Sequence, residues 1–254
     1  QLIWQLAKRD VVGRYRGSLL GLFWSLVHPL LMLAVYTFVF GVVFRSKWGV
    51  TEPGSKLEFS LILFAGLIVF GIFSEFMNRA PGIVLANPNY VKKIVFPLEI
   101  LPWVLLASAI FHALVSLGVL VVMLLAVQGY VPWTMVLLPV VLLPLIFLCL
   151  GLGWFLASWG VYVRDVGQMV GVVTSALLFL SPLFFPSSAL PENVRPLIRL
   201  NPLSFPIEQA REVMLWGHMP NWEGLLLYGS VCFALMWLGF AWFQKTRRGF
   251  ADVM

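Results

Sequence analysis

The chain has 254 residues, of which 61% are hydrophobic and only 11% are charged, and its net charge is +6. Soluble domains carry about 25% charged residues, so this composition excludes a soluble globular protein and predicts an all-α integral membrane protein. The basic residues are spread over loops and termini, which indicates membrane topology and headgroup contact and argues against a nucleic-acid surface. Neither the two cysteines, Cys149 and Cys232, nor the three histidines have metal-ligand spacing, so no metal site is expected.

The first segment, residues 1–17, is predicted to form a loosely amphipathic helix that lies in the plane of the membrane surface. Gln5, Lys8, Arg9 and Arg16 fall on one arc of such a helix, and apolar side chains cover most of the rest. The apolar run that follows is too long for a secretory signal and lacks a small-residue cleavage site. We therefore expect an interfacial helix.

Six apolar runs each approach the ~20 residues that cross a bilayer as a helix. They cover residues 22–44, 59–77, 100–127, 135–161, 169–185 and 225–243. Six transmembrane helices place both chain ends on one side, and most of the 17 Lys and Arg residues then lie on that side. Because basic residues near span ends are retained inside, both termini are predicted to be cytoplasmic.

A basic, proline-containing stretch, residues 87–102, separates the second and third spans. A helix cannot continue through its three prolines, and about two helical turns fit between the first two of them. Lys92 and Lys93 place the stretch in the cytoplasm. We expect a short coupling helix that is open to a soluble partner, and a helix lying on lipid headgroups is the alternative.

Residues 186–221 contain six prolines and are too polar to span the membrane. Ser204 is expected to cap a helix that runs to Trp216 and ends at Gly217, and residues 190–200 form a second candidate helix. Beside a short fifth span, two half-apolar helices fit a re-entrant exterior structure, which is tolerated at membrane depth where protein surrounds it. Two surface helices are the alternative.

No catalytic constellation is visible, so the chain is not expected to be an enzyme. Glu75 lies within a span, and Arg79, four residues later on the same helix face, predicts a neutralising pair, with a proton relay as the alternative. His112, also within a span, is expected to be hydrogen-bonded in the bundle. The stretch from Gly239 to Thr246 matches a phosphate-binding loop except at its second glycine, and it ends an apolar span. Any ATP chemistry would therefore have to come from another chain.

Two groups of aromatic residues are candidates for a substrate path. They are Tyr36, Phe40 and Phe44 in the first span and Phe179, Phe184 and Phe185 near the end of the fifth. The first three recur every four residues and so share one helix face. Most aromatic residues in membrane proteins pack or form interfacial belts. The alternative is that these rings contact the C–H faces of sugars along a path without fixed charge.

Several stretches occur together in the order found in a known family. They are Arg14-Tyr-Arg-Gly-Ser-Leu-Leu-Gly-Leu-Phe-Trp24 followed by Pro29, then residues 87–102, then Arg164-Asp165 with Ser181-Pro182, and then Asn201-Pro202. The chain resembles the membrane (permease) subunit of type-2 ABC exporters for cell-surface polysaccharides such as O-antigen, capsule and teichoic acid. The resemblance covers nearly the whole chain and does not fix the substrate.

The resemblance implies a homodimer in the bacterial inner membrane, with a pore for a lipid-linked polysaccharide lined largely by the first and fifth spans. Two ABC ATPase subunits would dock on the cytoplasmic side and bind ATP and Mg. Because no further domain follows Met254, recognition of the polymer end is expected to belong to the ATPase. The alternatives are a type-2 exporter of a lipid or drug, a membrane-embedded transferase and a secondary transporter.

The same resemblance assigns roles to individual residues. The docking candidates are Asn87, Pro88, Tyr90, Lys92 and Lys93, together with Lys8 and Arg9 of the N-terminal helix. The cytoplasmic entrance would be formed by Arg14, Arg16, Trp24, Arg164 and Asp165. The two aromatic groups become the sugar path, and residues 186–221 correspond to the family's re-entrant helices.

Overall fold

The computed structural model describes residues 2–39, 56–92, 96–185, 193, 198 and 200–253, and the regular structure of these residues is helical. In this part of the chain, five helices are long and apolar enough to cross a membrane, and Val166–Leu180 is a shorter apolar helix. The helices are α1 Leu2–Tyr15, α2 Trp24–Tyr36, α3 Lys56–Arg79, α4 Pro88–Lys92, α5 Leu101–Gln128, α6 Leu138–Tyr162, α7 Val166–Leu180, α9 Ser204–Arg211, α10 Trp222–Thr246 and α11 Phe250–Val253. An all-α membrane protein with about six spans is thereby confirmed.

The helix ends follow local chemistry and move some predicted boundaries. α7 begins before residue 169 and ends at Leu180, short of the predicted 185, because Ser181 is extended and Pro182 cannot continue the helix. α10 begins earlier than predicted because Asn221 caps it, its side-chain oxygen accepting a hydrogen bond from the Gly224 amide at 3.0 Å. α2 ends at Tyr36, and the structure describes the chain up to residue 39. The remainder of the predicted first span, residues 40–44, lies outside the described residues.

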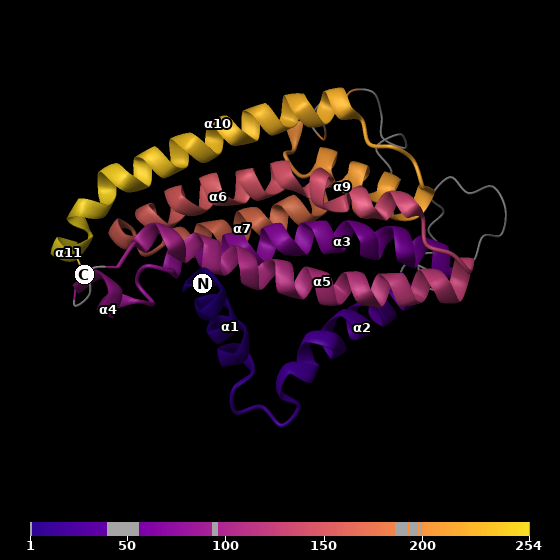
Figure 1. The fold of residues 1–254 in the computed structure, drawn as a ribbon, viewed down its shortest axis with the longest axis horizontal. Coiled ribbons are helices and arrows are strands. Elements are labelled where there is room, and N and C mark those ends of the chain that lie inside the picture. The colour runs from indigo at the N-terminus through magenta and orange to yellow at the C-terminus, as the bar shows by residue number, and fades with distance from the viewer. Residues whose placement is uncertain are drawn as a thin grey trace.

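The long helices α3, α5, α6, α7 and α10 run side by side, whereas α1 and α2 diverge from them as the two arms of a V (Figure 1). α3 is central, and its buried side chains contribute much of the hydrophobic core. α4, α11 and the start of α1 lie at the same end of the bundle (Figure 1). This end therefore gathers segments that the sequence predicts to lie on the cytoplasmic side.

α6 and α10 approach each other closely at small residues. A Cβ on Gly151 of α6 would lie 2.7 Å from the Leu235 carbonyl oxygen of α10, and Gly239 of α10 faces the Gly151 backbone. Small residues allow such close backbone contact between membrane helices. The glycine that begins the partial phosphate-loop match is therefore a packing residue within a helix.

The segment predicted to be exterior combines a confirmed helix with a corrected start. α9 is followed by a π-helical turn, Glu212–Trp216, that ends at Gly217 in the left-handed region (φ 72°), as the sequence predicts. Ser204 is not the cap, since Leu203 holds that position and the Ser204 hydroxyl donates to the Ile198 carbonyl at 2.6 Å. The predicted helix over residues 190–200 falls mostly outside the described residues.

Candidate functional site

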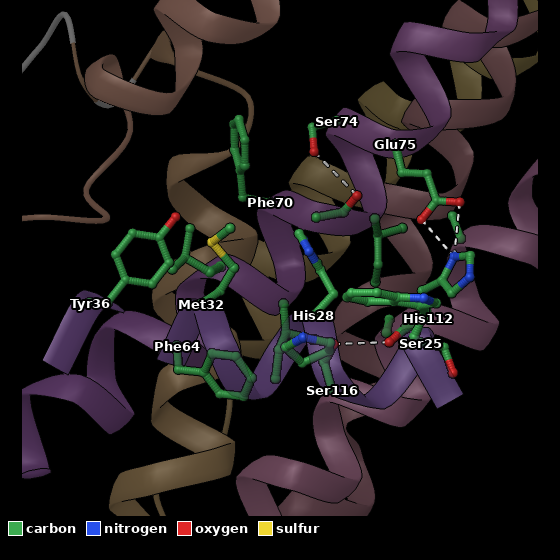
Figure 2. Close-up of a pocket in the computed structure, with 18 of the residues that line it drawn as sticks. Ser25, His28, Met32, Tyr36, Phe64, Phe70, Ser74, Glu75, His112 and Ser116 are labelled. Carbon is green, nitrogen blue, oxygen red and sulfur yellow. Dashed lines mark hydrogen bonds and ion pairs between the residues drawn. The ribbon is translucent and has the colours of Figure 1, made fainter. Parts of the chain in front are cut away.

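A cavity of about 610 Å³ lies between α2, α3 and α5, with Leu178 of α7 also on its wall. Figure 2 shows its two ends: Glu75 and His112 lie at one, and Met32, Tyr36 and Phe64 lie at the other. The arrangement follows from the sequence because His112 is the one ionisable residue of α5 and Glu75 follows a long apolar stretch of α3. The cavity is thus amphipathic, with a polar end and an apolar, aromatic end.

His112 of α5 joins two helices at the polar end. Its Nδ1 lies 2.9 Å from Oε2 of Glu75 on α3, and its Nε2 lies 3.0 Å from the hydroxyl of Tyr15 on α1. With a hydrogen on Nδ1, the ring donates to the carboxylate and accepts from the tyrosine hydroxyl. The expectation that His112 is hydrogen-bonded in the bundle is confirmed.

The predicted pair between Glu75 and Arg79 is wrong. Glu75 forms its ion pair with Arg14 of α1, and Arg79 donates two hydrogen bonds to Asp10 of α1, at 2.9 and 2.6 Å. Arg14 also donates to the Ser108 hydroxyl of α5 at 3.1 Å. A planar guanidinium matches a carboxylate through two parallel bonds, which the four-residue spacing within one helix does not provide here. The network therefore fastens α1 to α3 and α5.

Electrostatics favour this attachment of α1. Burial alone would raise the pKa of Asp10, but the hydrogen bonds and charge of Arg79, together with Arg14, lower it below its ordinary value. A lowered folded-state pKa stabilises the attachment at pH values above the ordinary carboxyl pKa, and this contribution is lost as pH falls through the lowered pKa. Burial raises the pKa of the Tyr15 hydroxyl, which therefore stays protonated and able to donate to His112.

A second contact joins α1 to α4 at the end of the bundle. Arg9 donates to the Tyr90 hydroxyl at 2.6 Å and lies over the Tyr90 ring, and this ring stacks on Phe96 with centroids 4.3 Å apart. Asn87 starts the turn into α4, donating from its side chain to the Ile83 carbonyl at 2.9 Å. Two predicted docking residues, Arg9 and Tyr90, are therefore bound to each other.

The other docking candidates are less constrained in this structure. Pro88 and Lys8 are exposed, and the described part of α4 runs from Pro88 to Lys92. Lys93 lies outside the described residues.

The predicted entrance residues lie in two regions of the chain. Arg14 and Trp24 line the cavity, whereas Arg16 is exposed in the turn after α1. Arg164 and Asp165 are exposed in the turn between α6 and α7, and neither is among the residues that line the cavity. The structure thus brings together two of the five residues.

The predicted aromatic path is partly visible. Tyr36 is half-buried and lines the apolar end of the cavity. Phe179 stacks on Phe184 with centroids 5.8 Å apart, and Phe185 is half-buried beside them in sequence. Phe40 and Phe44 lie outside the described residues. No described residue tests the proposed contact with sugar.

Sequence reasoning missed the role of Arg211, which it counted only as an exterior positive charge. Arg211 is 1% exposed and donates to the carbonyls of Ile62, Pro182 and Leu183, at 3.0, 2.5 and 3.0 Å. A Cβ on Gly66 would lie 2.6 Å from its guanidinium, so the glycine makes room for it. The available signal was a cation two residues before the apolar stretch 213–216.

Within the described residues, no group of three His, Cys, Asp or Glu side chains is placed to hold a metal ion. The site is therefore a cavity between membrane helices, connected by a charged network to a peripheral helix. Its fold and composition define a multi-pass membrane protein. Comparison with known proteins identifies the kind.

The family model described as ABC-2 type transporter matches residues 1–215, so the chain belongs to the ABC-2 type transporter family. It is 28% identical to the O-antigen export system permease protein RfbA of Myxococcus xanthus, covering 99% of this chain and 94% of the relative. It is 26% identical to the O-antigen export system permease protein RfbA of Klebsiella pneumoniae, covering 98% of this chain and 93% of that relative. It is 25% identical to the polysialic acid transport protein KpsM of Escherichia coli, covering 91% of this chain and 86% of that relative.

Proposed function

We propose that the chain is the membrane subunit of an ATP-driven exporter that moves a lipid-linked polysaccharide across the bacterial inner membrane. The observation that carries the proposal is the extent of the similarity, which runs through almost all of this chain and of relatives named for O-antigen export. A relative named for polysialic acid transport adds a second kind of polysaccharide. A polysaccharide is therefore the substrate class, and its sugars are left open.

In the proposed complex, two copies of the chain form the pore and two ABC ATPase subunits bind ATP and Mg. α4, the start of α1 and α11 share one end of the bundle, and this end would face the cytoplasm and the ATPases (Figure 1). α2 and α7 would line the pore, since both carry exposed apolar residues, such as Leu31 on α2 and Val172 and Phe179 on α7. Exposed apolar faces suit either a partner copy or lipid.

The experiment is transport into inverted membrane vesicles that contain the chain and its ATPase. ATP should move radiolabelled lipid-linked polysaccharide into the lumen, where an added glycosidase cannot reach it. A hydrolysis-deficient ATPase is the control, because it leaves the membrane subunit unchanged. Protection of a lipid or drug substrate, with the polysaccharide remaining digestible, would contradict the proposal.

A further inference from the structure

A second hollow, which we call the tryptophan groove, shares no lining residue with the cavity. Its volume is about 320 Å³, and Trp103 of α5, Trp154 of α6, and Trp237 and Phe240 of α10 form its walls. Trp154 meets Trp103 and Phe240 edge to face, with centroids 6.3 and 5.0 Å apart. The walls are therefore rigid, aromatic and apolar.

The mouth of the groove carries one acid and one base. Glu99 lines the groove and forms an ion pair with Arg247 at 2.9 Å, and the two side chains are 28% and 41% exposed. The Trp154 indole donates to the Glu99 backbone carbonyl at 3.1 Å, which fixes the acid at the edge of the aromatic wall. Both charges are thus positioned and open to solvent or to a headgroup.

The depth of the groove matches the upper part of a phospholipid. Phe240 and Arg247 lie seven residues apart near the end of α10, which corresponds to roughly 10 Å along a helix. The charged mouth then lies at headgroup level and the tryptophans lie below it, where tryptophan is enriched in membrane proteins. A phosphate, a glycerol and the first part of an acyl chain extend over a similar length.

We propose that the tryptophan groove binds one zwitterionic phospholipid with a primary ammonium headgroup, that is, an ethanolamine phospholipid. Its phosphate pairs with Arg247, its ammonium donates hydrogen bonds to Glu99, and an acyl chain lies against Trp103 and Trp237. One headgroup then contacts both charges of the mouth and takes the place of the Glu99–Arg247 ion pair. A purely anionic headgroup has no positive group for Glu99, so its negative charge and the Glu99 carboxylate repel each other. A choline headgroup is positively charged but has no N–H to donate to the carboxylate.

The test is native mass spectrometry of the full-length chain in micelles that contain equal amounts of ethanolamine, glycerol and choline phospholipids with identical acyl chains. One ethanolamine lipid per chain should be retained, in preference to the other two. Glu99→Gln should reduce the ratio of ethanolamine to glycerol lipid by about two- to fivefold, as expected for an exposed charge pair. Equal retention of the three lipids, or preference for either of the others, would overturn the proposal.

A matched pair of tryptophan variants locates the site. Trp237→Ala should lower retention by about tenfold, since it removes most of an aromatic contact surface. Trp222→Ala removes an exposed tryptophan from the other end of the same helix, and it should leave retention unchanged. Both side chains are exposed, at 63% and 48%, so neither change empties the core. Equal effects of the two variants would show that the lipid binds elsewhere.

Discussion

Arg79 binds Asp10 of α1 through both terminal nitrogens, at 2.9 and 2.6 Å, and leaves Glu75, one turn away on its own helix, to Arg14 and His112. Two charges of a membrane helix are thus neutralised by a peripheral helix. Since Arg9 of the same peripheral helix holds Tyr90 of α4, α1 connects the end of the bundle to the wall of the cavity. The first prediction tests this attachment.

Asp10→Asn should loosen α1. The pair is partly exposed, so the expected loss of attachment free energy is about 1 kcal/mol. The readout is the rate at which a thiol reagent labels a Val11→Cys variant, because Val11 is only 7% exposed in the attached helix. Asp165→Asn, which changes an exposed carboxylate in the turn before α7, is the control and should not alter the rate.

His112→Phe should destabilise the polar end of the cavity. The variant removes the partner of Glu75 and of Tyr15 at once, which should cost about 1–3 kcal/mol. His112→Gln retains a hydrogen-bond donor and an acceptor, so it should lower the free energy of unfolding by less than His112→Phe. Thermal unfolding in detergent, followed by circular dichroism, measures both. Identical midpoints for the two variants would indicate that packing, and not hydrogen bonding, determines the role of His112.

The long helices could be predicted because a chain that crosses a membrane must satisfy its polar backbone groups within a helix of about 20 apolar residues, and the sequence shows such runs directly. The partners of Glu75 and Arg79 could not. Helix spacing places these two residues on one face, but an ion pair at that spacing stabilises a helix by only about 0.3–0.5 kcal/mol. Asp10 and Arg14 offer better geometry, so Arg79 pairs with Asp10 and Glu75 pairs with Arg14. Those partners are distant in sequence, so no local pattern indicates them.

Arg211 illustrates a second limit. Its acceptors are backbone carbonyls of α3 and of the segment after α7, and every residue has such a carbonyl. A charged residue in an exterior segment therefore looks like an ordinary surface residue until the fold is known. Its hydrogen bonds show that a side chain from α9 satisfies the Pro182 and Leu183 carbonyls, which follow the end of α7.

Gly66→Ala should displace Arg211 and destabilise the protein. A Cβ at this position meets the buried guanidinium and the Leu183 side chain, at 2.6 and 2.8 Å. Overpacking of this kind costs about 1–3 kcal/mol. Gly71→Ala on the same helix is the matched control, since nothing lies within 4 Å of its added carbon. A lowered thermal midpoint for Gly66→Ala alone is expected, and equal midpoints would contradict the packing argument.

Arg9→Ala and Tyr90→Phe should uncouple ATP hydrolysis from export if α1 and α4 receive the movement of the ATPase. Both variants remove the 2.6 Å hydrogen bond and leave the spans unchanged. Vesicles are expected to hydrolyse ATP while exporting less polysaccharide per ATP. Arg248→Ala, an exposed cation at the same end of the bundle, controls for charge alone. An unchanged ratio of export to hydrolysis would show that the contact is only structural.

The last prediction concerns Tyr36, which lines the apolar end of the cavity and is half-buried against the core. If its ring contacts a passing sugar chain, Tyr36→Ala should reduce export while the protein inserts normally, because loose binding at many points permits conduction. If the ring only packs, its loss should resemble that of Phe64→Ala, which empties a site that is 4% exposed and should cost about 3–5 kcal/mol and lower the yield. The measurement is membrane yield together with polysaccharide accumulated in the cytoplasm. Normal export by a stably inserted Tyr36→Ala variant would overturn the assignment of this residue to the path.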